Sequence, residues 1–328
     1  MMEQPLLSVR HLSISLSRKG AKLPVLNDVS FDVAPGEVLG VVGESGAGKS
    51  VAGAAIIDLL VPPLQRTAGE ISLRGDRLDL MSPRRLRRVR GKRVGFIFQD
   101  PMTSLNPVLS IGKQLRDTMR THLRLGQAEL NRRALDWVTR VGLPNPERIL
   151  KAAPHELSGG QRQRIVIALA LCAEPEIVIA DEPTTALDVS VQAQMLDLMR
   201  VLHKETGTAM VLITHDLGVV AKMADRVAVF YAGRVIETAS TRALFQSPRH
   251  PYTAGLIGAT PAPDAQGDMQ VVAIPGAMPG VGALPPGCAF HPRCPRAQAD
   301  CRTIVPPLAP LGTGQAACLY PLPERTAA

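Results

Sequence analysis

Short apolar runs separated by polar turns recur along the chain and predict a mixed α/β protein. Residues 6–16 alternate apolar and polar positions, as a half-exposed strand does. Residues 38–42 are apolar throughout, which is typical of a strand buried on both faces. Further strands are expected at residues 25–33, 70–74, 94–98, 177–180, 210–214, 227–231 and 234–237. The last two predict a hairpin around Ala232 and Gly233.

Helical periodicity marks other parts of the chain. Residues 51–60 predict a helix directly after the buried strand 38–42, and 165–172 predict an apolar helix. Between residues 103 and 157 apolar positions recur at helical spacing, which predicts a mostly helical subdomain. Residues 84–93 carry seven basic residues, but no aromatic residue is interleaved. We therefore expect a solvated helix face there rather than a surface for nucleic acid.

The composition changes after residue 260. Residues 261–328 contain 13 of the 28 prolines and show little periodicity. We therefore expect a first domain at residues 1–260 and a small, loop-rich C-terminal module at 261–328.

Composition limits the class of protein. The net charge of +8 suits an anionic ligand or an anionic membrane surface, and aromatic residues make up only 3% of the chain. No apolar run approaches the roughly 18–20 residues that span a bilayer. Because the N-terminus has no signal-peptide core, we expect a cytoplasmic protein with reduced thiols.

The strongest local motif follows the strand at 38–42. Residues 43–50 fit G-x-x-x-x-G-K-[ST], the loop whose backbone N–H groups surround a phosphate at a helix N-terminus. In this motif the lysine contacts the β- and γ-phosphates and the final hydroxyl binds Mg²⁺. The sequence therefore predicts an ATP site at Gly43, Glu44, Ser45, Gly46, Ala47, Gly48, Lys49 and Ser50.

Acidic residues follow a second buried strand. Asp181 can hold Mg²⁺, and Glu182 can polarise the water that attacks the γ-phosphate. His215 follows another apolar strand, where a lone histidine is more often structural. Ser158 and Gln161 spell S-x-x-Q, so a helix capping box is the structural alternative to a phosphate contact there.

Six motifs in register resemble the ATPases of ABC transporters. They are the phosphate loop, Gln99, 157-LSGGQ-161, 177-IVIADEP-183, 184-TTALD-188 and 214-THD-216. The resemblance implies an α/β fold: a RecA-like P-loop NTPase core of the ABC ATPase type. An N-terminal antiparallel β subdomain, a helical subdomain and a C-terminal module would accompany this core.

The resemblance also implies residue roles. Glu182, His215 and Gln99 would be catalytic, and Ser50, Gln99 and Asp181 would bind Mg²⁺. Asp188 would lie at a subunit boundary. The signature residues would contact ATP held by an opposite subunit in a head-to-tail dimer; they are Leu157, Ser158, Gly159, Gly160 and Gln161. One departure is Leu16, which stands where the family usually stacks an aromatic residue on adenine.

Two further stretches resemble one branch of the family. Residues 249–253, Arg-His-Pro-Tyr-Thr, and the cysteine-containing segment from residue 287 are similar to peptide and nickel importers, and so is 98-FQDPMTSLNP-107. This resemblance implies the D-type ATPase subunit of a dipeptide or oligopeptide importer at the cytoplasmic membrane face. Nickel chelates, glutathione and other small solutes remain alternative substrates. A non-transport ABC ATPase is a more distant alternative.

The same resemblance implies partners. The chain would act with two membrane permease subunits and, through them, with a solute-binding protein. A heterodimer with a related second ATPase is favoured over a homodimer, and no nucleic acid is expected.

Four of the five cysteines lie close together near the C-terminus, at Cys288, Cys294, Cys301 and Cys318. Two disulfides conflict with a reducing compartment, and four inert thiols are a second possibility. Four thiolates suit [4Fe–4S] better than zinc, whose sites usually begin with C-x2–4-C. Since some peptide-importer ATPases carry a cluster in this module, we expect [4Fe–4S], with Zn²⁺ as the alternative.

Overall fold

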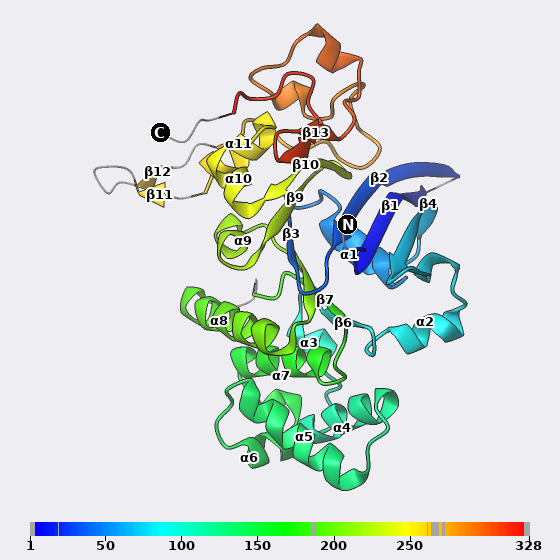
Figure 1. Ribbon diagram of the computed structural model, residues 1–328, viewed down its shortest axis with the longest axis vertical. Coiled ribbons are helices and arrows are strands. Elements are labelled where there is room, and N and C mark those ends of the chain that lie inside the picture. The colour runs from blue at the N-terminus through cyan, green and yellow to red at the C-terminus, as the bar shows by residue number, and fades with distance from the viewer. Residues whose placement is uncertain are drawn as a thin grey trace. The chain divides into compact units, whose positions relative to one another are not determined.

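The structure is a computed structural model that describes residues 4–18, 20–184, 188–260, 262–263, 269–270 and 273–324. The chain divides into two compact units (Figure 1). The first unit contains residues 1–33, 38–79 and 212–328, and the second contains 34–37 and 80–211. Each unit is described by itself. The predicted domain boundary at residue 260 stays a prediction, and residue 261 lies outside the described residues.

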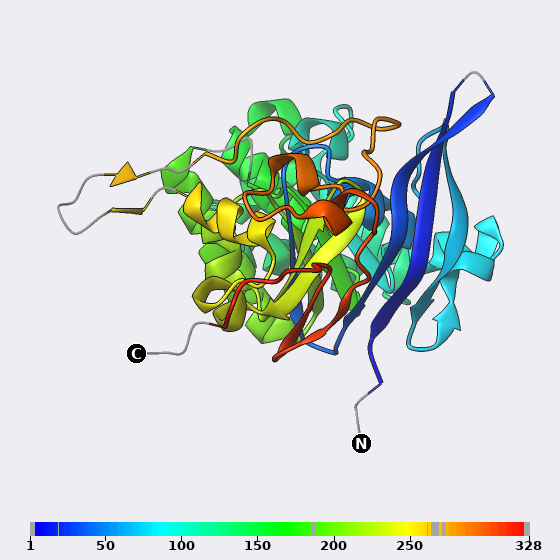
Figure 2. The same ribbon diagram turned by 90° about the horizontal axis from the view of Figure 1, so that it is seen from above.

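An antiparallel sheet forms the N-terminal part of the first unit, with the strand order β2-β1-β4-β5. Its strands are β1 Leu7–Arg18, β2 Ala21–Val33, β4 Leu64–Leu73 and β5 Asp76–Arg77. The alternation predicted for the first strand is present, because Leu7, Val9, Leu12 and Ile14 are fully buried. Figure 2 shows these long strands side by side. The third strand begins six residues before the predicted 70–74, since polar positions such as Arg66 also pair with β1.

A mixed sheet forms the other part of the first unit, with the order β13-β14-β10-β9-β3. Its strands are β3 Val38–Val42, β9 Arg226–Tyr231, β10 Arg234–Ser240, β13 Ala309–Leu311 and β14 Gly314–Ala316. β3 pairs with β9 in parallel, whereas β9 and β10 form the predicted antiparallel hairpin. The helices of this unit are α1 Lys49–Ile56, α9 Leu217–Met223, α10 Thr241–Gln246 and α11 Pro251–Gly258. A short pair, β11 Ala262–Pro263 and β12 Met269–Gln270, follows.

The second unit contains β6 Val94–Ile97 and β7 Ile177–Asp181, which pair in parallel. Its helices are α2 Pro83–Val89, α3 Pro101–Ser104, α4 Ile111–His122, α5 Gln127–Arg140, α6 Pro146–Lys151, α7 Gly159–Leu171 and α8 Val189–Thr206. α4, α5 and α6 pack together, as Figure 1 shows. Leu115 and Met119 of α4 and Trp137 of α5 are buried. This packing accounts for the helical spacing seen in the sequence. In β8 Ala209–Ile213, residues 209–211 belong to the second unit and residues 212–213 to the first.

Residues 84–89 of the basic stretch lie in α2, which has the predicted solvated face. Arg84, Arg85, Arg87 and Arg88 are exposed, while Leu86 is buried. Among the described residues, we find no helix that combines the length and the apolar character needed to cross a membrane.

Candidate functional site

The phosphate loop lies between β3 and α1 in the first unit, as predicted. Gly43 and Gly48 have positive φ angles of 150° and 99°. A Cβ on Gly43 would lie 2.2 Å from the carbonyl oxygen of Phe230, and one on Gly48 would lie 2.5 Å from a methyl carbon of Leu26. Gly43 therefore requires glycine for conformation and for space, because it faces backbone atoms, whereas Gly48 requires glycine for its conformation.

Lys49 is the first residue of α1 and is only 5% exposed. Its Nζ donates to the carbonyl oxygens of Gly43 and Glu44 at 2.8 and 3.0 Å. These bonds hold the ammonium group against the loop that the sequence assigns to phosphate binding. A buried positive charge beside a helix N-terminus is a suitable environment for an anion.

His215 lies two residues after the end of β8 and beside the end of β3. The Thr214 N–H donates to the carbonyl oxygen of Val41 at 3.1 Å, one residue before the last position of β3. Thr214 is buried, His215 is exposed, and the Asp216 carboxylate caps α9. Within the first unit, His215 and the phosphate loop therefore lie at the same edge of the sheet. Ligands usually bind at this edge in such sheets.

Gln99 and Glu182 come together in the second unit. They follow β6 and β7, whose parallel pairing places Ile97 opposite Ala180. The Gln99 Nε2 donates to Glu182 Oε2 at 3.3 Å. Asp181, the last residue of β7, is 9% exposed. Glu182 has a φ of +46°, a conformation that costs free energy for a non-glycine residue and is often found at functional sites.

The signature residues form the exposed start of α7. The predicted capping box is present: Gln161 N–H donates to Ser158 Oγ at 3.3 Å, and Ser158 N–H donates to Gln161 Oε1 at 2.9 Å. A Cβ on Gly159 would meet no atom within 4 Å, whereas Leu157 is buried. Gln163, on the same helix, donates from Nε2 to the carbonyl oxygen of Pro183 at 2.7 Å. The start of α7 is thus exposed at Gly159, and α7 is hydrogen-bonded to the segment after Glu182.

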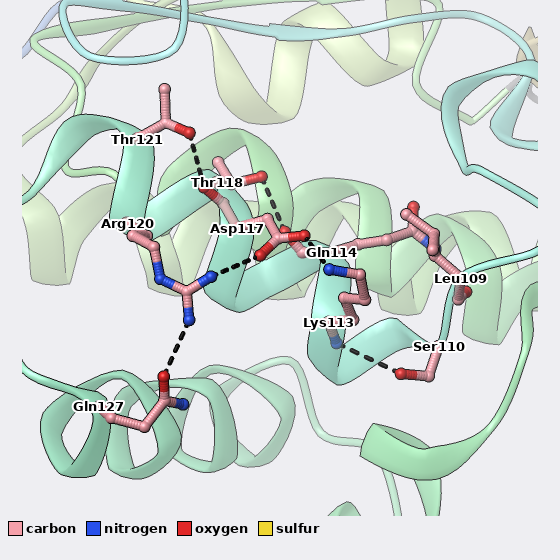
Figure 3. A network of polar contacts seen from close by, with 9 residues as sticks. All are labelled: Leu109, Ser110, Lys113, Gln114, Asp117, Thr118, Arg120, Thr121 and Gln127. Atoms are coloured by element: carbon pink, nitrogen blue, oxygen red, sulfur yellow. Dashed lines mark hydrogen bonds and ion pairs between the residues drawn. The ribbon is translucent and has the colours of Figure 1, made fainter.

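The loop after Gln99 is anchored on α4. Gln114 accepts from the Asn106 N–H at 2.9 Å and donates to the Leu109 carbonyl oxygen at 2.9 Å. Figure 3 shows Gln114 and Leu109 next to the ion pairs of Asp117 with Lys113 and Arg120. The side-chain hydrogen bond from Lys113 lowers the pKa of Asp117.

Asp188 begins α8 as its N-cap. Its carboxylate accepts from the Val191 N–H at 2.9 Å and from the Ser190 hydroxyl at 2.8 Å, and its pKa is lowered by these bonds. The middle of the 184–188 motif, residues 185–187, lies outside the described residues.

Two contacts to the phosphate loop were missed in the sequence. The Glu44 N–H donates to the hydroxyl oxygen of Tyr252 at 2.9 Å, and Arg293 Nη1 donates to Glu44 Oε1 at 2.9 Å. The motif at residues 249–253 is the sequence signal that points to Tyr252. Partners more than 200 positions away in the sequence leave no local pattern.

The prediction of an iron–sulfur cluster is wrong. The four C-terminal cysteines do line one cavity, with Phe290 and Tyr320 among its other walls, but that cavity measures about 10 Å³. This is room for about one water molecule, not for a cluster. In the part of the chain that the structure describes, no three His, Cys, Asp or Glu side chains are grouped to hold a metal ion, so the zinc alternative gains no support either.

Comparison with known proteins places the chain in a family. The model of the ABC transporter family matches residues 26–185, and that of the oligopeptide/dipeptide transporter C-terminal region matches residues 236–301. The oligopeptide transport ATP-binding protein OppD of Bacillus subtilis is 47% identical over 286 residues, which is 87% of this chain and 80% of the relative. The chain belongs to the ABC transporter ATP-binding family.

Further relatives support the oligopeptide/dipeptide branch. The dipeptide transport ATP-binding protein DppD of Bacillus subtilis is 44% identical and covers 92% of this chain and 90% of its own length. OppD of Mycobacterium tuberculosis is 45% identical over 96% of this chain, but the chain spans only about half, 52%, of that protein. The predicted resemblance to D-type peptide-importer subunits is therefore confirmed.

Solved structures agree with the predicted fold class. The dimeric structure of MJ0796, a bacterial ABC transporter cassette, has a TM-score of 0.65 and 28% identity, and covers 72% of this chain and 99% of its own. A post-hydrolysis state of the same cassette bound to ADP and phosphate also has a TM-score of 0.65, with 27% identity. The α/β fold of the ABC ATPase type, with its antiparallel β subdomain, is confirmed.

Proposed function

We propose that this ABC ATPase binds and hydrolyses ATP to power the import of dipeptides or oligopeptides through separate membrane subunits. The observation that carries the proposal is the Gln99–Glu182 hydrogen bond at the ends of two paired parallel strands, next to a buried Asp181. A carboxylate so oriented can accept a proton from the water that attacks the γ-phosphate, which contributes about 10²–10⁴-fold to the rate.

The phosphate loop would bind the ATP phosphates for this reaction. Lys49 would neutralise the β- and γ-phosphates, and the backbone N–H groups of residues 43–50 would bind their oxygens. Ser50, Gln99 and Asp181 offer hydroxyl, amide and carboxylate oxygens, the donor set that Mg²⁺ prefers, so these residues fit the ion. When bound, Mg²⁺ would offset the charge that develops on the phosphates.

The substrate class and the partners are inferred from the relatives. Relatives named for oligopeptide transport, dipeptide transport or putative peptide import match most of this chain at 43–47% identity. This similarity supports a peptide as the transported molecule. It also supports two permease subunits, a solute-binding protein and a location at the cytoplasmic face of the inner membrane. Import of nickel chelates, glutathione or other small solutes by the same mechanism is the alternative.

An exposed apolar loop supports the permease contact. Phe98, Met102 and Val108 are 43%, 58% and 84% exposed, although all three are large and hydrophobic. Met102 and Val108 lie in the segment after Gln99 that α4 anchors, and Phe98 directly precedes Gln99. Exposed apolar groups on an anchored loop are typical of a protein interface.

The open start of α7 supports a composite site. Ser158 and Gly159 are exposed, and the helix N-terminus favours an anion. We assign this surface to ATP held by a second ATPase subunit, with Asp188 at the boundary between the subunits. A related partner in a heterodimer is favoured.

The test is ATP-driven uptake of a labelled dipeptide or oligopeptide by the complex purified with its permeases and reconstituted in vesicles. Glu182→Gln should retain ATP binding and lose uptake, while Glu147→Gln, an exposed glutamate of α6, should behave as the unaltered protein. Association with nucleic acid instead of permeases, or full uptake by Glu182→Gln, would contradict the proposal.

A further inference from the structure

Glu44 is an unexpected residue in a phosphate-binding loop. It lies between Gly43 and Ser45, so it places a negative charge in the segment assigned to the phosphates. An unpaired carboxylate there would repel the ligand, because like charges at close range oppose binding. The structure provides a partner for this charge from the far end of the chain.

That partner is Arg293, which is almost fully buried. Its side chain is 6% exposed, whereas that of Glu44 is 29% exposed. One nitrogen, Nη1, lies 2.9 and 3.2 Å from the two oxygens of Glu44. The Arg293 Nε donates to the Pro275 carbonyl oxygen at 2.8 Å, and the guanidinium also lies over the rings of Tyr231 and Phe290, 5.9 Å from each centroid. Arg293 is therefore held by contacts from several sides.

The motif at residues 249–253 binds Glu44 as well, through the backbone N–H group of Glu44. Glu237 is 1% exposed and accepts from the N–H groups of Arg249 and His250 at 2.7 and 2.8 Å. His250 Nδ1 accepts from the Tyr252 N–H at 3.0 Å. Tyr252 in turn accepts from the Glu44 N–H. A chain of hydrogen bonds thus runs from a buried glutamate to the first peptide of the phosphate loop.

A third contact comes from Met278. Its terminal methyl carbon lies 3.3 Å from the position that a Cβ on Gly46 would occupy. Residues 275–293 therefore approach the phosphate loop at the Glu44 side chain and at Gly46. All of these residues belong to the first unit.

We propose that Arg293 is a positioning residue for the nucleotide site: it neutralises and immobilises Glu44, so that the C-terminal segment sets the affinity of the phosphate loop for the ATP phosphates. This inference rests on the proposed ATP binding at residues 43–50. Arg293 acts through Glu44 rather than on the nucleotide. Its effect is therefore electrostatic, and it increases with the number of phosphates on the ligand.

The test measures the binding of ATP, ADP and AMP to the full-length chain by titration calorimetry. Arg293→Gln should weaken ATP about tenfold and ADP less, and should leave AMP nearly unchanged, because it unmasks one negative charge beside the phosphates. The control is Arg302→Gln, the same change at an exposed arginine of the C-terminal segment, which should leave all three affinities unchanged.

A second substitution separates charge from packing. Adding Glu44→Gln to Arg293→Gln should restore most of the ATP affinity, because the unpaired charge is then removed. Glu44→Gln alone removes the anion that Arg293 pairs with, so the positive charge beside the phosphates is no longer offset and ATP should bind more tightly than to the unaltered chain. This variant provides a readout even if Arg293→Gln does not fold.

The outcomes separate this inference from the proposed function. Equal losses for ATP, ADP and AMP that Glu44→Gln does not restore would make Arg293 a merely structural residue and overturn the inference. Unchanged ATP affinity in Arg293→Gln, or a tenfold loss in Glu44→Gln alone, would overturn it as well. If the unaltered chain binds no ATP, the proposed function itself fails.

Discussion

Acid conditions should destabilise the first unit through His250. The ring is 1% exposed, it accepts the Tyr252 N–H, and burial lowers its pKa from 6.5 to about 3. The folded state therefore binds fewer protons than the unfolded state below pH 6.5. The stabilisation is complete above about pH 6.5 and is lost as the pH falls toward 3.

The magnitude follows from the two pKa values. With 6.5 in the unfolded chain and about 3 in the folded chain, lowering the pH from 8 to 5 should cost about 2 kcal/mol of unfolding free energy. His250→Asn is the matched variant, since asparagine can also cap α11 by accepting the Tyr252 N–H but does not titrate. Glu237, which accepts the backbone N–H of residue 250 and whose pKa is raised by burial, is present in both proteins.

The assay is hydrogen exchange over α11, corrected for the intrinsic dependence of exchange on pH. Between pH 8 and pH 5, the unaltered chain should lose about 2 kcal/mol more opening free energy than His250→Asn. Equal losses in the two proteins would show that His250 protonates without cost, and the reasoning from its burial would be wrong.

Three further predictions concern the site residues. Glu182→Gln should keep ATP binding and reduce hydrolysis by about 10²–10⁴-fold, measured as phosphate release by the assembled complex; near-normal release would refute the assigned base. Lys49→Ala should weaken nucleotide crosslinking to its own chain, whereas Ser158→Arg should spare it and block closure over the partner's nucleotide; parallel losses would contradict the composite site. Asp188→Ala should lower stability through the lost helix cap, measured as a lower urea midpoint of unfolding.

Local sequence was sufficient for many of the strands, for the helical subdomain and for the family motifs. The phosphate loop is contiguous, so its glycine spacing and the following helix could be recognised directly. The same holds for the capping box of Ser158 and Gln161, whose partners lie three residues apart. Both rest on short-range geometry, which a sequence records as spacing.

The cysteine prediction shows where spacing misleads. Four thiols within 31 residues suggested a metal site, and the chain does bring them to one cavity. Their number and spacing could not reveal that aromatic side chains fill the surrounding space. The volume available to a ligand is a property of the packed module, not of the spacing.

By itself, the sequence determined the fold class, the family and the residues of the phosphate loop, because each depends on neighbours in the chain or on motifs in order. Only the tertiary structure decided which residues surround that loop. Tyr252 and Arg293 lie 208 and 249 positions from Glu44, and they reach it because β9, β10 and α11 pack around Tyr231 and Phe290. A contact between residues so far apart in the sequence forms only when the whole unit packs. No local pattern of residues could therefore specify it.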